Sequence, residues 1–201
     1  SVIHAVSDEQ DMRRMGGLYK FMPITGFTFI VGWLAIAGVF PFSGFWSKDE
    51  ILLYAWNADE IGGKGLWVVG IVTAVLTAFY MTRQVIMVFF GEARWHDAHE
   101  EHGAHGDFTP HESPKVMLAP LVVLAGLSAV AGLMNLPFSD KFKVLEHWLH
   151  PVIVYEHHLP SAPVLWGLAS GAVTTAAVGI FLGWTVYSRK RFDAAKIEKP
   201  V

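Results

Sequence analysis

Four long apolar stretches restrict what this chain can fold into more than any other feature of its sequence. They occupy residues 21–45, 66–90, 116–136 and 164–187. Each exceeds the roughly 20 residues that a helix needs to cross a hydrocarbon core of about 30 Å. A lipid-exposed backbone must satisfy its own hydrogen bonds, so these stretches are predicted to be helices. We therefore predict an all-α integral membrane protein with four transmembrane helices.

The composition excludes several other classes of protein. A soluble helical bundle would carry polar residues on one face of each helix, whereas these stretches are apolar on all sides. The formal net charge of −3 comes with no basic tract, so nucleic-acid binding is not expected. Cysteine is absent, which excludes thiolate-bound iron-sulfur clusters, cysteine zinc sites and disulfides. We expect no cofactor in this chain, and any redox centre must lie on a partner.

The positive charges outside the apolar stretches predict an orientation. Short cytoplasmic loops carry an excess of Lys and Arg. The two ends and the middle loop hold ten such residues, and the two remaining loops hold three: Lys64, Lys141 and Lys143. The ten are Arg13, Arg14, Lys20, Arg94, Lys115, Arg189, Lys190, Arg191, Lys196 and Lys199. Both ends are therefore predicted to be cytoplasmic, and the chain, which opens without Met, is expected to be part of a longer protein.

Lys48 lies in the run GVFPFSGFWSKDEILLYAW, where a Lys-Asp-Glu triplet interrupts apolar sequence. A charge at membrane depth is costly and usually lines an ion pathway or meets a counter-charge. Residues 21–56 as one helix would be about 54 Å long, so this segment must tilt, break or leave the membrane. Proline cannot continue a helix, and glycine permits unusual backbone angles. We predict that the first transmembrane helix is discontinuous and broken near Pro41 to Gly44.

Two interpretations of Lys48 stay open from the residues alone. In the first, the lysine ends a span and extends its ammonium to the interface. In the second, it lies inside the membrane beside Asp49, where movement of either charge can load or unload its proton. The helix break and the apolar ILLYAW that follows favour the second interpretation, a proton relay.

Arg83 and His4 are two further candidates for proton translocation. Arg83 lies among Thr and Gln residues in TAFYMTRQVIMVFF and either lines a polar channel or extends to the nearer interface. His4 can titrate near neutral pH, so it can carry protons, although a lone histidine is more often a structural group. We retain both residues as candidates.

The loop WHDAHEEHGAHGDFTPHESP is rich in histidine, with His96, His99, His102 and His105 at intervals of three. Imidazoles at such spacing can bind a transition metal. A polar loop with glycine is more often a solvated connection, and nothing in the sequence determines a coordination geometry. We therefore predict no metal site.

The third and fourth apolar stretches hold few polar residues and are interpreted as scaffold. The fourth contains small residues that are typical of close helix packing in membranes, among them Gly171, Gly179 and Gly183.

Four segments in this order resemble the large antiporter-like subunit at the distal end of the membrane arm of respiratory complex I: HAVSDEQDMRRMGGL, FPFSGFWSKDEIL, TAFYMTRQVIMVFFGEAR and HESPKVMLAPLVVLA. The resemblance implies that residues 1–136 form the C-terminal part of an antiporter-like, proton-translocating domain. Residues 137–201 would form an outer loop, one more transmembrane helix and a cytoplasmic tail leading to a further C-terminal region.

The same resemblance implies a proton-translocating subunit of NADH:quinone oxidoreductase in the bacterial inner (plasma) membrane. Lys48 would pass a proton outward, Asp49 adjoins it in the same motif, and flavin and iron-sulfur clusters would belong to partner subunits. The implied partners are other membrane-arm subunits, especially the neighbouring antiporter-like subunit, and membrane lipid. Three alternatives remain: the large subunit of a multisubunit cation/proton antiporter, a membrane subunit of an energy-converting hydrogenase, and a purely structural scaffold.

Overall fold

The computed structural model describes residues 1–57, 63–95, 109–134, 144–149, 151–152 and 162–188, and every regular element in these ranges is helical. Three helices are long and apolar enough to cross a membrane: Gly63–Phe90, Lys115–Met134 and Trp166–Ser188. A shorter apolar helix covers Pro23–Ala37. The chain is thus an all-helical integral membrane protein. Three of the predicted spans are single helices, and the first is built differently.

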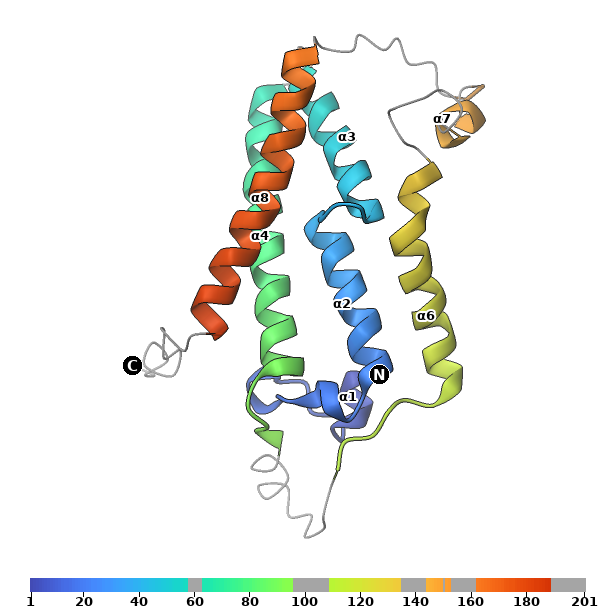
Figure 1. Ribbon diagram of the computed structural model, residues 1–201, viewed down its shortest axis with the longest axis vertical. Coiled ribbons are helices and arrows are strands. Elements are labelled where there is room, and N and C mark those ends of the chain that lie inside the picture. Colours follow the sequence, from blue (N-terminus) through green and yellow to red (C-terminus); the bar gives the residue numbers. More distant parts are fainter. Residues whose placement is uncertain (58–62, 96–108, 135–143, 150, 153–161, 189–201) are drawn as a thin grey trace.

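The first predicted span consists of two helices, α2 (Pro23–Ala37) and α3 (Ser43–Asn57), placed end to end along α4 (Figure 1). Fifteen residues make about 22 Å of helix, which is too short to cross the hydrocarbon core alone. The break covers residues 38–42, so it begins at Gly38, earlier than the predicted Pro41. Gly38 ends α2 because it adopts a left-handed conformation, with φ +77°.

The helix α4 (Gly63–Val85) continues into a π-helical turn, η3 (Ile86–Phe90), and packs against α8 (Ala162–Ser188). This contact depends on small residues. A Cβ at Gly179 would lie 2.6 Å from the Val75 carbonyl oxygen, and one at Gly183 would lie 2.8 Å from the Cβ of Thr82. The two glycines are four residues apart, the spacing that lets two membrane helices approach closely. A Cβ at Gly171 would meet nothing within 4 Å, so this glycine, although on the same helix, takes no part in the contact.

The helix α6 (Lys115–Val130) and its 3₁₀ extension η4 (Ala131–Met134) run beside α2 and reach the start of α3 (Figure 1). At this far end Gly132 lies against the Trp46 ring and 2.9 Å, measured from an added Cβ, from the Cα of Ser43. Therefore α6 connects the level at which α2 begins to the level at which α3 begins. A short helix, α7 (Val144–Leu149), follows it in the chain.

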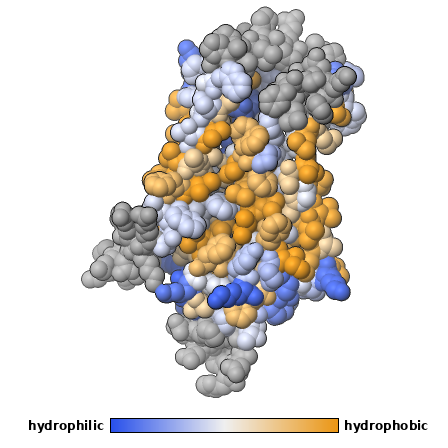
Figure 2. Space-filling model, in the orientation of Figure 1, coloured by the Kyte–Doolittle hydropathy of each residue, from blue (hydrophilic) through white to orange (hydrophobic). Residues whose placement is uncertain are grey.

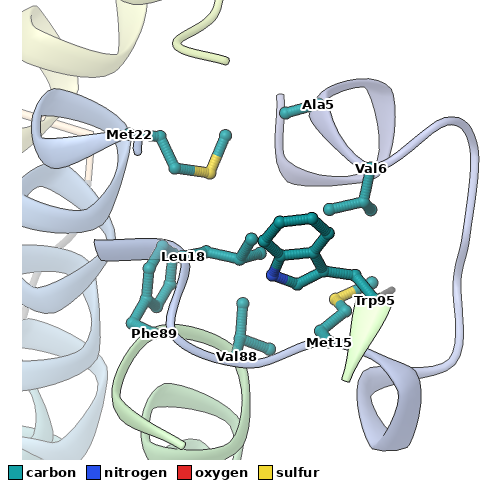
Figure 3. Close-up of a cluster of buried hydrophobic side chains, with 8 residues drawn as sticks. All are labelled: Ala5, Val6, Met15, Leu18, Met22, Val88, Phe89 and Trp95. Carbon is teal, nitrogen blue, oxygen red and sulfur yellow. The ribbon is translucent and has the colours of Figure 1, made fainter. Parts of the chain in front are cut away.

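A compact apolar cluster closes the end of the molecule that carries α1 (Val2–Ala5), η1 (Met12–Arg14) and η2 (Leu18–Lys20). The indole of Trp95 lies among the side chains of this cluster (Figure 3). Its members are Ala5, Val6, Met15, Leu18, Met22, Val88, Phe89 and Trp95. The cluster joins the N-terminal segment to η3 and thereby determines where α2 starts.

The surface has the pattern of a membrane protein. In the view of Figure 2, apolar side chains cover the middle of the visible face, and charged side chains gather below it, at the end that carries α1. Many large apolar residues on the long helices are exposed in this chain, for example Val123 (60%) and Phe181 (66%). Such side chains are stable only against lipid or neighbouring protein.

Candidate functional site at the helix break

Lys48 lies in the second turn of α3, and its ammonium group points back to the end of α2. The Nζ atom donates to the carbonyl oxygens of Ala37 (3.0 Å) and Ile36 (3.2 Å). Both acceptors belong to the last turn of α2, where helix carbonyls have no partner within the helix. The side chain therefore crosses the break and joins the two half-length helices.

The last four carbonyls of α2 are all satisfied by this arrangement. The left-handed Gly38 forms a Schellman motif, in which the amide of Val39 donates to Leu34 (3.0 Å) and that of Gly38 donates to Ala35 (3.1 Å). The Lys48 ammonium satisfies the two that remain, Ile36 and Ala37. A helix end buried in a membrane without such partners would be strongly unfavourable.

Two glycines permit this close approach. A Cβ at Gly38 would lie 3.0 Å from the Lys48 ammonium nitrogen, and its positive φ disfavours any side chain. A Cβ at Gly44 would overlap the carbonyl oxygen of Ala35. The first turn of α3 thus rests directly on the backbone of α2, and the sequence GVFPFSG provides a glycine at each point of contact.

The electrostatics of the break suit a cation. The C-terminus of a helix carries about half a negative charge, and a cation there is typically favourable by about 0.3–1 kcal/mol, rising to about 2 kcal/mol when partly buried. Half-helix ends of this kind coordinate cations in membrane transporters. The ammonium has three donors and uses two of them on α2. It is held in its charged form and keeps one N–H for a further acceptor.

Asp49 follows Lys48 in the chain and is half-buried. One of its oxygens, Oδ1, is buried and has no hydrogen-bond partner among the residues that the structure describes. The ammonium is directed to backbone carbonyls and not to this carboxylate. Lys48 and Asp49 are therefore adjacent groups that are separately placed, and the buried oxygen is available to a proton or a water molecule.

The structure does not bring Arg83 and His4 to the break. Arg83 lies in the last turn of α4, with its guanidinium carbon 5.5 Å from the centroid of the Tyr187 ring on α8. Its Nε is buried without a hydrogen-bond partner in the described part of the chain. His4 lies in α1 and is exposed, with its ring 5.8 Å from that of His111. Both residues lie toward the α1 end of the molecule (Figure 1).

Sequence reasoning missed a second charged group on α2, Glu112. Its Oε2 accepts from the amides of Ile24 (2.8 Å) and Thr25 (3.4 Å), and its Oε1 accepts from the Thr25 hydroxyl (2.6 Å) and the Ser113 amide (3.1 Å). Ile24 and Thr25 are in the first turn of α2, so Glu112 caps this helix from 88 positions away in the chain. Its place in the motif HESP was visible, but its target was not.

The environment of Glu112 keeps it ionised. Burial raises the pKa of this carboxyl, but the hydrogen bonds from Thr25, Ile24 and Ser113 together lower it below its ordinary value of 4.5. A depressed pKa means that the carboxylate stabilises the folded state fully above pH 4.5, and that this contribution is lost as the pH falls through the lowered pKa. At neutral pH Glu112 is a fixed anion.

Within the described ranges, no group of three or more His, Cys, Asp or Glu residues is placed to hold a metal ion. The histidines of the loop, His96, His99, His102 and His105, lie outside the described residues. Their interpretation as a solvated connection stays a prediction.

The close contact at Gly44 leads to a testable expectation. Substitution of Gly44 by alanine should destabilise the protein by about 1–3 kcal/mol, the usual cost of forcing atoms into a well-packed site. The measurement is the thermal midpoint of the detergent-solubilised protein. Gly32→Ala on α2 is the matched control, because a Cβ there meets nothing within 4 Å and should leave the midpoint equal or higher. Equal midpoints for the two variants would contradict the proposed contact between α3 and α2.

Comparison with known proteins gives one consistent result. Residues 81–198, more than half of the chain, match a family described as the C-terminal transmembrane segments of an NADH-dehydrogenase component of complex I. Residues 1–77 match the family described as NADH:quinone oxidoreductase/Mrp antiporter, transmembrane. The two matches follow one another along the chain and together include the helix break and the α4–α8 pair.

Individual relatives agree with these families. The chain is 42% identical to NADH-quinone oxidoreductase subunit L of Mycobacterium tuberculosis, with 93% of this chain and 28% of that protein covered. It is 37% identical to NAD(P)H-quinone oxidoreductase chain 5 of Picosynechococcus sp., with 98% and 32% covered. For subunit L of Neisseria meningitidis serogroup A the identity is 36%, with 98% and 32% covered. The chain thus spans about a third of the length of these relatives.

Proposed function

Since this chain belongs to the family of complex I membrane subunits that includes NADH-quinone oxidoreductase subunit L, we propose that it is part of a proton-translocating subunit of a bacterial respiratory NADH:quinone oxidoreductase. The chain carries protons and no electrons. The observation that supports this most directly is the Lys48 ammonium, which lies at a helix break and is held by the carbonyls of Ile36 and Ala37.

Lys48 is the proton-carrying group in this proposal. When charged, its ammonium stabilises the negative end of α2 and connects α2 to α3. Release of one proton leaves a neutral amine, so the electrostatic part of that stabilisation is lost. The proton state of Lys48 and the junction of the two helices are therefore coupled, as a relay that responds to movement elsewhere in the complex requires.

The other candidate residues take secondary roles in the same proposal. Asp49, with its buried and unpartnered oxygen, is the nearest group that can accept a proton or bind a water molecule beside Lys48. Arg83 acts as a fixed cation between α4 and α8. His4, exposed at the α1 end next to His111, exchanges protons with the aqueous phase.

The remaining assignments follow from the family and from the distribution of positive charge. We place the chain in the bacterial inner membrane with both ends cytoplasmic. Its partners are other membrane-arm subunits, especially the neighbouring antiporter-like subunit, together with lipid. Flavin and iron-sulfur clusters belong to partner subunits. Residues 1–136 are part of the antiporter-like domain, and residues 137–201 add an outer loop, a further span and a tail.

Affinity purification of the full-length protein from its native membrane tests this proposal. We expect it to bring down flavin and iron-sulfur subunits in an assembly that oxidises NADH with quinone. Deletion of the protein should reduce the number of protons translocated for each NADH oxidised.

A cation/proton antiporter is the second candidate, because the family matched by residues 1–77 includes Mrp antiporters by its description. It predicts a sodium-dependent exchange of protons and a purified assembly without NADH oxidation. That result would reject the assignment to NADH:quinone oxidoreductase.

A further inference from the structure

The helix α2 is held by a charged side chain at each end, and neither charge comes from α2 itself. At the N-terminus the carboxylate of Glu112 accepts from the amides of Ile24 and Thr25. At the C-terminus the ammonium of Lys48 donates to Ile36 and Ala37. A negative group at the start and a positive group at the end both complement the helix dipole.

The N-terminal end of α2 needs an external partner. Pro23 at the first helical position has no N–H, and Met22 before it supplies no side-chain cap. Glu112 provides the acceptors that are missing, and its four hydrogen bonds join the start of α2 to the segment that leads into α6. The neighbouring residue Ser113 continues this connection, because its hydroxyl lies 2.8 Å from that of Ser1.

The helix α6 carries the connection to the level of Lys48. It begins three residues after Glu112 at Lys115, runs beside α2, and ends in η4, where Gly132 lies against Trp46 and Ser43 of α3. The start of α2 and the start of α3 are thus attached to the same helix. A shift of α2 along its axis at Glu112 would move the Ile36 and Ala37 carbonyls relative to the Lys48 ammonium.

We propose that Glu112 is a positioning residue for the proton relay at Lys48: by holding the N-terminus of α2 against α6, it places the two carbonyls that bind the ammonium. The inference rests on the function proposed above. Glu112 carries no proton itself, and it lies at the opposite end of a 15-residue helix from the relay.

The test uses the whole respiratory complex in liposomes, with protons translocated for each NADH oxidised measured across its active pH range. Glu112→Gln keeps the shape and removes the charge. We expect it to lower this ratio by about tenfold and to shift its pH dependence, because small misplacement of a reacting group can cost up to about a hundredfold. Glu112→Asp, which keeps the charge, should retain a larger share of pumping with a smaller shift in the same direction.

Asp11→Asn is the matched control. Asp11 is also a carboxylate near the α1 end that accepts a backbone amide, but it caps η1 instead of α2. This variant should leave the pumping ratio and its pH dependence unchanged.

Two outcomes would overturn the inference. The first is a Glu112→Gln complex that assembles in smaller amounts but pumps with the normal ratio and pH profile, since this shows a purely structural role. If Glu112→Gln fails to assemble, a normal pH profile for Glu112→Asp is the second. Lys48→Met measured in parallel separates the two proposals. Normal pumping by that variant rejects the relay itself, whereas loss of pumping there with normal Glu112 variants rejects only the positioning role.

Discussion

Substitution of Lys48 by methionine should abolish the proton translocation that depends on this chain, with a fall of about a hundredfold or more in the rate of that step. Proton transfer by a positioned side chain typically contributes a factor of about 10² to 10⁴. Methionine has a similar length but cannot carry a proton. The measurement is NADH-driven acidification of liposomes that contain the purified complex, normalised to the rate of NADH oxidation.

Lys48→Arg is the sharper control for this prediction. A guanidinium remains charged at any physiological pH, so it can still complement the end of α2 but cannot release a proton. The arginine variant should therefore assemble better than Lys48→Met and still fail to pump. If Lys48 were only an anchor for its helix, arginine would preserve full activity, and that result would reject the relay.

Methionine at position 48 should also weaken the junction between α2 and α3. It leaves the carbonyls of Ile36 and Ala37 without their donor, and a buried polar group without a partner costs about 1–3 kcal/mol. A reduced thermal midpoint of the Lys48→Met complex, partly restored in Lys48→Arg, is the expected accompaniment.

Leucine at Gly179 should prevent correct packing of α8 on α4. The first added carbon already lies 2.6 Å from both the Val75 carbonyl oxygen and the Cβ of Ala78, and neither group is a flexible side-chain end. The helices must separate, so the loss should exceed the roughly 1–3 kcal/mol usual for overpacking. We expect little or no assembled complex, measured by native gel electrophoresis of solubilised membranes.

Gly171→Leu provides a matched control on the same helix, about two turns away, with the same change in volume and helix propensity. A Cβ at Gly171 meets nothing within 4 Å in this chain. Normal assembly of Gly171→Leu together with failure of Gly179→Leu would identify the α4–α8 contact as the cause. If Gly179→Leu assembles normally, the packing of α8 described above is wrong.

A large part of the fold follows from hydropathy and from the residues that break helices. Apolar length predicts helices because lipid offers the backbone no hydrogen-bond partner, and three such helices lie where expected. The discontinuity before Lys48 was also foreseeable, since a single helix would exceed the thickness of the membrane. Its position was displaced toward Gly38, because a left-handed glycine ends a helix before the proline is reached.

The partners of the charged residues could not be predicted in the same way. The sequence places Asp49 beside Lys48, but the ammonium instead meets backbone carbonyls of α2. Main-chain acceptors leave no trace in residue identity, and they become available only where a helix ends. Likewise, nothing in HESP indicates that Glu112 reaches Ile24, 88 positions away.

The sequence by itself determined that this chain is helical and membrane-embedded, that one helix breaks, and that a lysine follows the break, because these properties depend on local composition and backbone chemistry. Only the tertiary structure decided which groups meet: the ammonium with the end of α2, the carboxylate with its start, and Gly179 instead of Gly171 with α4. Such contacts depend on how separate helices lie against one another, and a helix of small or apolar residues has several faces that satisfy the same sequence pattern.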